Sequence, residues 1–301
     1  MLERRTTSQG LVYYVSPLLE RVGVKHAFST RIGGVSPPPF DSMNLGNPGG
    51  CAVQDDDHHI AQNYRLLQSA IGCADHTRLW VHQVHGGNVA GAMRGETFEN
   101  GIKADAIVSN DPAKLLAVRV ADCVPVLIAG SDGAIVAAVH AGWRGVIAGV
   151  VTNAINKMIA AGARTESLVV AVGPGISENV FEIGPEVIDE FQRVFGSDAP
   201  TRRTADGKGR VDLQRAITIQ LNRAGVLSSQ IDATDRCTFR DQAEFFSHRR
   251  DRGITGRMAA LIAARSKCPG LFDELDSFLA ILGDAEETIQ AASLDDLKQL
   301  R

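Results

Sequence analysis

The sequence predicts an α/β protein, with a single three-layer α/β/α domain built around a mixed β-sheet. Three near-continuous apolar runs, at 115–120, 124–129 and 134–139, are typical of strands that are buried on both faces. Segments with helical spacing of apolar residues alternate with these runs, which favours helices packed in layers against a sheet. Because no fixed-period repeat or linker interrupts residues 1–268, we expect them to form one domain.

The N-terminal part predicts short strands, a long loop and one helix. Residues 11–28 read as a strand, a turn and a second strand. Residues 29–50 are rich in Gly and Pro, which predicts a long irregular loop of the kind that often carries function. Residues 54–71 place apolar side chains at helical spacing and stop before a glycine.

The rest of the domain predicts strands and helices in alternation. Besides the three apolar runs, short β-rich segments predict further strands, and 3.6-residue periodicity predicts helices. In order, we expect strands at 79–84, 106–109 and 168–172, helices at 146–161, 185–195, 213–224 and 255–264, and an exposed loop at 196–210.

The C-terminal segment differs from the rest in charge. Residues 270–301 hold eight acidic and two basic side chains, a net charge of 2 − 8 = −6, whereas the whole chain carries −4. The remainder is therefore at −4 − (−6) = +2, which would suit an anionic co-substrate, although ordinary surface charge explains the same average. We expect residues 269–301 to form an acidic helical extension.

Composition narrows the class of protein. A hydrophobic content of 44% with a charged content of 22% is typical of a soluble globular protein, and the net negative charge argues against a nucleic-acid binder. No apolar run has the length of a signal peptide or a membrane span. The five widely spaced cysteines suit reduced thiols. We therefore expect a cytoplasmic monomer or weak dimer that binds neither nucleic acid nor membranes.

Three side chains of metal-ligand type, His85, Cys123 and His140, lie near the ends of predicted strands. Ligand sites in α/β proteins gather beyond the carboxyl ends of strands, so these side chains could meet. Two imidazoles and a thiolate suit zinc and leave a fourth position for water or substrate. Their wide spacing is not a metal-binding motif by itself. The alternative is a Cys that acts as a small hydrophobe and two hydrogen-bonded histidines.

Two segments predict an anion site. Residues 140–145 form a strand-turn-helix junction in which backbone N–H groups and Arg144 could hold an anion, although a tight turn that needs glycine explains the same pattern. Residues 247–252 are dense in cations, and Arg31 lies in the Gly-rich loop. A solvated arginine face is the alternative for these residues.

Acid–base chemistry has three candidates, Asp122, Glu182 and Asp105. Asp122 adjoins Cys123, so on an extended strand its side chain would point to the opposite face. Glu182 lies between apolar residues and could be partly buried with a raised pKa. The alternatives are a turn-capping carboxylate for Asp122 and an ion-paired carboxylate for Glu182.

Taken in order, these motifs resemble the bacterial YfiH/YlmD-like family, also called the laccase-domain or purine nucleoside phosphorylase YfiH family. The resemblance has two departures, at His248, where Tyr is usual, and at Met43, where Leu is usual. His248 could be an extra ligand or a pH-sensitive group. The matching segments are 28–36, 43–46, 83–86, 104–106, 121–125, 140–145, 173–176, 181–184, 237–238, 245–250 and 255–257.

The resemblance implies the YfiH-like fold and a zinc site formed by His85, Cys123 and His140, with copper less expected. It implies phosphorolysis of adenosine, inosine, guanosine or methylthioadenosine, and deamination of adenosine, with purine nucleosides and phosphate as partners. We expect these three ligands to be catalytic, with Glu182 or Asp122 moving protons. In all, substrate or phosphate contacts are expected from Arg31, Asn44, Arg144 and Arg249.

Three rival functions use the same residues. A multicopper polyphenol oxidase would need His-x-His pairs, and the eight histidines of this chain form none. A metal-free hydrolase would use Cys123 as nucleophile and His140 as base. A non-catalytic binding or cell-wall quality-control protein would use the acidic tail to recruit a partner.

Overall fold

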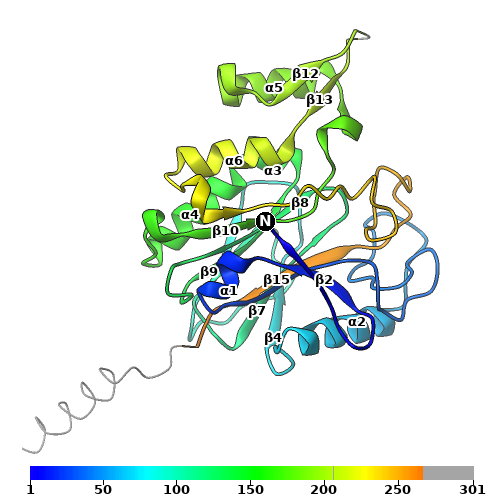
Figure 1. The fold of residues 1–301 in the computed structure, drawn as a ribbon, viewed down its shortest axis with the longest axis vertical. Coiled ribbons are helices and arrows are strands. Elements are labelled where there is room, and N and C mark those ends of the chain that lie inside the picture. The colour runs from blue at the N-terminus through cyan, green and yellow to red at the C-terminus, as the bar shows by residue number, and fades with distance from the viewer. Residues whose placement is uncertain (206, 267–301) are drawn as a thin grey trace, which may run out of the picture. The chain divides into compact units, whose positions relative to one another are not determined.

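The computed structural model describes residues 1–205 and 207–266. A first compact unit runs from Met1 to Arg265, and a second begins at Ser266. The predicted end of the domain at 268 and the predicted acidic extension over 269–301 lie outside the described residues. The helices and strands given below all belong to the first unit (Figure 1).

Six strands form a first mixed sheet, in the spatial order β1-β2-β3-β15-β7-β4. Neighbouring strands are antiparallel except for β4, which is parallel to β7. The carboxyl ends of β4 and β7 therefore lie at the same edge of this sheet. The strands are β1 (Glu3–Thr6), β2 (Val12–Val15), β3 (Lys25–Ser29), β15 (Met258–Ala263), β7 (Lys114–Val120) and β4 (Thr77–Trp80).

Six other strands form a second mixed sheet, in the order β14-β10-β8-β9-β6-β5. The pairs β14–β10 and β6–β5 are parallel, and the other pairs are antiparallel. The strands are β14 (Ile231–Asp232), β10 (Val169–Val172), β8 (Val124–Ala129), β9 (Val136–Ala141), β6 (Ala106–Ser109) and β5 (Val89–Ala92).

The two sheets pack face to face, and side chains from both sheets form the core between them. Successive side chains of a strand point to opposite faces, so the other side chains of each strand lie on the outer face of its sheet. On β7, Leu116 and Val118 contact the core between the sheets, whereas Leu115 and Ala117 pack with α2 (Asp57–Ala70). The predicted α/β class with mixed sheets is confirmed. The strands are divided between two sheets, however, which adds a layer to the predicted arrangement. The order is helix, sheet, sheet, helices.

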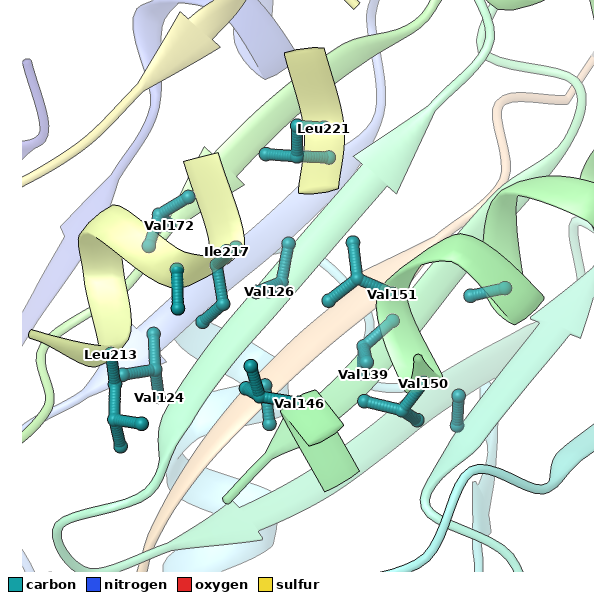
Figure 2. Packing of buried hydrophobic residues seen from close by; sticks show 14 of the residues in the cluster. Val124, Val126, Val139, Val146, Val150, Val151, Val172, Leu213, Ile217 and Leu221 are labelled. Atoms are coloured by element: carbon teal, nitrogen blue, oxygen red, sulfur yellow. The ribbon is translucent and has the colours of Figure 1, made fainter. Parts of the chain in front are cut away.

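Helices cover the outer face of the second sheet. Val124 and Val126 of β8 point toward these helices, and the valines and leucines of the helices meet them (Figure 2). Each such side chain contributes about 1.5–3 kcal/mol when it is fully buried. No helix in the described part of the chain is long and apolar enough to span a membrane. These helices are α3 (Trp143–Ile147), α4 (Val150–Ala160) and α6 (Leu213–Arg223). A further helix, α5 (Pro185–Phe195), packs against α3 and a small third sheet (Figure 1).

The remaining elements are short. The helix α1 (Pro17–Arg21) occupies the predicted turn between β2 and β3. A small antiparallel sheet joins β11 (Glu182–Ile183), β13 (Gly209–Val211) and β12 (Thr201–Arg203), so the predicted loop at 196–210 contains strands. Single 3₁₀ turns lie at Thr165–Ser167, Glu178–Val180, Gly196–Asp198 and Ser228–Gln230.

The helix predicted over 255–264 is wrong, because this segment forms β15. Its residues Met-Ala-Ala-Leu-Ile-Ala have helical propensity, but the strand lies between β3 and β7 and is buried throughout. Pairing on both sides satisfies its backbone groups and outweighs the propensity.

The helix predicted over 146–161 is interrupted. Gly149, with φ 73°, separates α3 from α4, and only glycine adopts this left-handed backbone at little cost. The first of the two helices, α3, begins at Trp143, and Gly142 separates it from β9. The predicted helices at 54–71, 185–195 and 213–224 are confirmed as α2, α5 and α6.

Candidate metal centre

Two of the three predicted ligands lie where the chain passes from the first sheet to the second, and the third lies on a strand of the second sheet. His85 is on the connection from β4 in the first sheet to β5 in the second. Cys123 is on the next such connection, from β7 to β8. His140 lies within β9, near its end. Because β4 and β7 are parallel, their connections leave from the same edge, which brings His85 near Cys123.

The three side chains form one cluster. Their ligand atoms all lie within 4.8 Å of one another. The rings of His85 and His140 meet edge to face, with centroids 4.9 Å apart. His140 is buried, Cys123 is half-buried and His85 is exposed, so the cluster is open toward solvent on the His85 side. It is the one such cluster of possible metal ligands among residues 1–205 and 207–266, and His248 is not part of it.

Asp105 holds two of the ligands in place. Its Oδ1 lies 2.8 Å from Nδ1 of His140 and accepts the N–H of His85 at 2.9 Å. Its Oδ2 accepts the N–H groups of Gly86 at 2.7 Å and Val84 at 3.2 Å. The carboxylate is fully buried, yet its pKa is lowered, because these hydrogen bonds and His140 outweigh the effect of burial. Since Nδ1 of His140 is occupied, Nε2 remains to bind a metal.

Gly142 makes room for the ligands. A Cβ atom at this position would lie 2.9 Å from the Sγ of Cys123 and 3.0 Å from Cδ2 of His85. Both separations are too short for carbon in contact with sulfur or carbon. Gly142 is therefore needed for the cluster as well as for the turn.

Cys123 and His140 are electrostatically coupled. Burial alone would raise the pKa of the Cys123 thiol, but His140 and His85 outweigh burial and lower it to about 6. Burial alone would lower the pKa of His140, but the charge of Cys123 and the hydrogen bond that His140 donates to Asp105 raise it to about 9. The free chain thus favours a thiolate beside an imidazolium at neutral pH. A bound metal would replace the imidazolium proton.

The donor set fits a zinc ion. Thiolate and imidazole are both zinc ligands, and three protein ligands with an open side for water or substrate are the pattern of catalytic zinc sites. The buried carboxylate behind His140 is the usual outer partner of a metal-binding histidine. A set of three donors that includes a thiolate is also compatible with copper.

Asp122 lies in the turn after β7 and not on an extended strand. Its backbone is left-handed, with φ 85°, so the prediction that its side chain points to the opposite face of a strand is wrong. Oδ1 accepts the hydroxyl of Thr238 and Oδ2 accepts the N–H of Arg249, both at 2.7 Å. Asp122 therefore ties the 237–238 and 245–250 segments to the neighbourhood of Cys123.

Glu182 and Arg249 lie on the rim of this region. The Glu182 side chain is 41% exposed and pairs with Lys208 at 2.7 Å, so the expected partial burial gives way to an exposed ion pair. Arg249 is exposed, donates to the backbone carbonyl of Glu182 and lies over the ring of Phe181. Arg144, on the first turn of α3, lies over the ring of its neighbour Trp143.

Arg31 and Asn44 make structural contacts. The guanidinium of Arg31 pairs with Asp41 at 3.1 Å and lies 4.7 Å from the ring centroid of Phe246. Asn44 is fully buried, and its amide bonds Asp55 and the backbone N–H of Arg257. Both side chains are therefore engaged by the protein, and contact with substrate stays a prediction for each.

Sequence reasoning missed the orienting role of Asp105, which was considered only for acid–base chemistry. It also left Arg119 and Arg257 unassigned, although both guanidinium groups lie in this region. The lone acid between alanines at 104–106 is the signal that could have indicated a buried, fully hydrogen-bonded carboxylate.

The chain is similar to a defined set of known proteins. Residues 25–265 match the family described as multi-copper polyphenol oxidoreductase laccase. The chain is 39% identical over 240 residues to purine nucleoside phosphorylase YfiH of Escherichia coli, which covers 80% of this chain and 93% of that protein. It is 39% identical over 243 residues to purine nucleoside phosphorylase Rv2149c of Mycobacterium tuberculosis. This alignment covers 80% of this chain and 92% of that protein.

Solved structures have the same fold. The crystal structure of YlmD from Geobacillus stearothermophilus matches with a TM-score of 0.77 and 30% identity, over 87% of this chain and 99% of that one. Bacillus licheniformis hypothetical protein YfiH matches with a TM-score of 0.77 and 27% identity over the same shares. Since the family match spans 25–265, most of its length, the chain belongs to the multi-copper polyphenol oxidoreductase laccase family, together with YfiH and YlmD.

Proposed function

We propose that this protein is a zinc-dependent enzyme of purine nucleosides. It would cleave adenosine, inosine, guanosine or methylthioadenosine with phosphate, and it would deaminate adenosine with water. The proposal rests above all on the cluster of His85, Cys123 and His140, whose ligand atoms lie within 4.8 Å of one another. It is supported by relatives that are named purine nucleoside phosphorylases.

His85, Cys123 and His140 would hold the metal. Bound zinc would supply a Lewis acid that polarises a substrate atom and makes water more acidic. Asp105 keeps the His140 ring oriented through Nδ1, and Gly142 leaves room for the side chains of Cys123 and His85. These contacts would hold the reacting atoms in one geometry, which is how an enzyme lowers the entropic part of a barrier.

The two reactions make different demands on the residues around the metal. In phosphorolysis a phosphate oxygen bonds to C1′ of the ribose while the N-glycosidic bond breaks, and the purine leaves with the electron pair and takes up a proton. In deamination water adds at C6 and ammonia leaves. Asp122 or Glu182 would carry the proton in either reaction, and Arg144 and Arg249 would contact substrate or phosphate.

Metal content and product identity test this proposal together. We expect about one zinc per purified chain by elemental mass spectrometry, adenine and ribose 1-phosphate from adenosine only when phosphate is present, and inosine without it. Cys123→Ala should lose the metal and both activities, whereas Cys73→Ala, which changes a buried thiol outside the cluster, should keep the metal. A wild-type protein that binds no metal and forms neither product would refute the proposal.

A metal-free hydrolase is the second candidate, and the coupling of Cys123 to His140 favours it. A thiolate, with its pKa lowered to about 6, beside an imidazolium is the ion pair of a cysteine nucleophile and its histidine partner. Such an enzyme would not need His85. Alkylation by iodoacetamide separates the two, because zinc protects a ligating thiolate. Rapid inactivation that is unchanged by a chelator would favour the hydrolase.

A further inference from the structure

Two arginines lie beside the metal centre without an acidic partner. Arg119 is the penultimate residue of β7, and Arg257 immediately precedes β15. Neither guanidinium forms a salt bridge with any carboxylate in residues 1–205 and 207–266. Arg31, which the sequence predicted as a phosphate contact, forms an ion pair with Asp41. The charge of Asp41 offsets the attraction of Arg31 for an anionic ligand.

The register of the first sheet puts both side chains on one face. Arg119 pairs with Ala259, and Val120 pairs with Met258. Continued by one step beyond the paired residues, the same register would set Arg257 opposite Ala121. Since residues opposite each other and residues two apart on a strand share a face, Arg119 and Arg257 project to the same side as diagonal neighbours. Both arginines lie at the end of the sheet where β7 stops, and Cys123 is in the connection that leaves this end.

The loop at 44–46 brings the two arginines together. The N–H of Leu45 bonds the carbonyl of Arg257 at 2.9 Å, and the amide oxygen of Asn44 accepts the N–H of Arg257. The Arg119 side chain packs directly on Gly46, where a Cβ atom would lie 2.7 Å from its Cδ. Asn44 thus acts as a positioning residue for Arg257, and Gly46 leaves space for Arg119.

Each arginine keeps donors free for a ligand. Arg257 Nη1 bonds the carbonyls of Thr255 and Gly256, which fixes the guanidinium and leaves Nη2 unbonded among the described residues. Arg119 lies 5.5 Å from the ring centroid of Trp80, and its guanidinium makes no hydrogen bond there within the described chain. Two half-buried cations whose N–H groups are not all bonded within the described chain match the oxygens of a tetrahedral anion.

The electrostatics agree with this geometry. Burial lowers the pKa of Arg257, Cys123 raises it, and the like charge of Arg119 lowers it again. Arg257 therefore lies close enough to interact with the metal-binding thiol and with the second arginine. A doubly negative ligand would relieve the repulsion between the two cations.

We propose that Arg119 and Arg257 form the subsite that binds inorganic phosphate beside the metal centre. This inference rests on the proposed phosphorolysis and identifies the residues that would hold its anionic co-substrate. Phosphate held there would lie next to the cluster that contains Cys123, and so next to the bound nucleoside.

Phosphate binding and phosphate kinetics test the inference separately. We expect inorganic phosphate to bind the zinc-loaded wild-type protein in calorimetry, and Arg119→Met and Arg257→Met each to weaken it about 10- to 100-fold, as for loss of a charge-assisted contact. The KM for phosphate should rise by the same factor, with the KM for nucleoside within about threefold. Arg65→Met, at an exposed position on α2, should leave both constants unchanged.

Three further variants guard against a loss of folding. Arg119→Lys and Arg257→Lys keep the charge and should retain part of the phosphate affinity. Gly46→Ala keeps every charge but displaces Arg119, and it should raise the KM for phosphate at wild-type zinc content.

The outcomes distinguish the two proposals. If both Met variants fold, hold zinc and bind phosphate like the wild type, the inference is overturned while phosphorolysis stands. If the wild type binds phosphate through these arginines but cleaves no nucleoside, the subsite stands and the proposed function fails.

Discussion

Replacing Asp105 by Asn tests whether this carboxylate organises the metal centre. Asp105 accepts four hydrogen bonds, two on each oxygen, from His140, His85, Gly86 and Val84. Asn has one accepting oxygen, so its NH₂ group must face two N–H donors whichever way the amide is turned. Leaving two buried donors unsatisfied costs about 1–3 kcal/mol each, so we expect Asp105→Asn to lower the free energy of unfolding by about 2–6 kcal/mol.

The same change should weaken the metal site. Loss of the partner that orients a metal-binding histidine typically lowers metal affinity about 10- to 100-fold. Urea unfolding of the metal-free protein gives the first quantity, and competition with a chelator of known zinc affinity gives the second. Asp105→Asn that unfolds within about 0.5 kcal/mol of the wild type and holds zinc equally well would contradict the role assigned to Asp105.

Asp122→Asn is the matched control for these two measurements. Asp122 is also buried beside a ligand, but it accepts one hydroxyl and one N–H. An Asn side chain can accept the N–H of Arg249 and donate to the oxygen of Thr238. Its cost should therefore be about 1 kcal/mol or less. If both variants lost the same stability and the same zinc affinity, the charge of each carboxylate, and not its hydrogen-bond pattern, would determine the loss.

Two further predictions follow from single positions. Gly142→Ala should lower zinc affinity at least about tenfold, measured by chelator competition, because its Cβ would lie 2.9 Å from the Sγ of Cys123; unchanged affinity would show that the cluster adapts. His26 is buried, and its pKa is lowered from 6.5 to about 4, chiefly by burial. The unfolded chain then binds more protons than the folded one between these values, so stability is full above pH 6.5 and falls toward pH 4. Between pH 7 and pH 5, urea unfolding should show a loss of about 2 kcal/mol that is absent in His26→Gln. An equal loss in that variant would exclude His26 as its source.

The apolar runs of the sequence are strong enough to define most of the second sheet. The runs at 124–129 and 134–139 correspond to β8 and β9. Every residue of these two strands is buried, so both strands belong in the middle of the sheet. The number of sheets was not predictable in the same way. A strand that is buried on both sides shows the same pattern whether it packs against a helix or against a second sheet.

The sequence by itself determined the α/β class, the family and the three ligand candidates, since these depend on residue type and order along the chain. Tertiary structure alone decided that His85, Cys123 and His140 meet, because the parallel pairing of β4 with β7 sets which connections share an edge. It also decided that 258–263 is a strand, through hydrogen bonds to residues more than a hundred positions away. The same pairing sets Arg119 beside Arg257, and no local pattern contains such a contact.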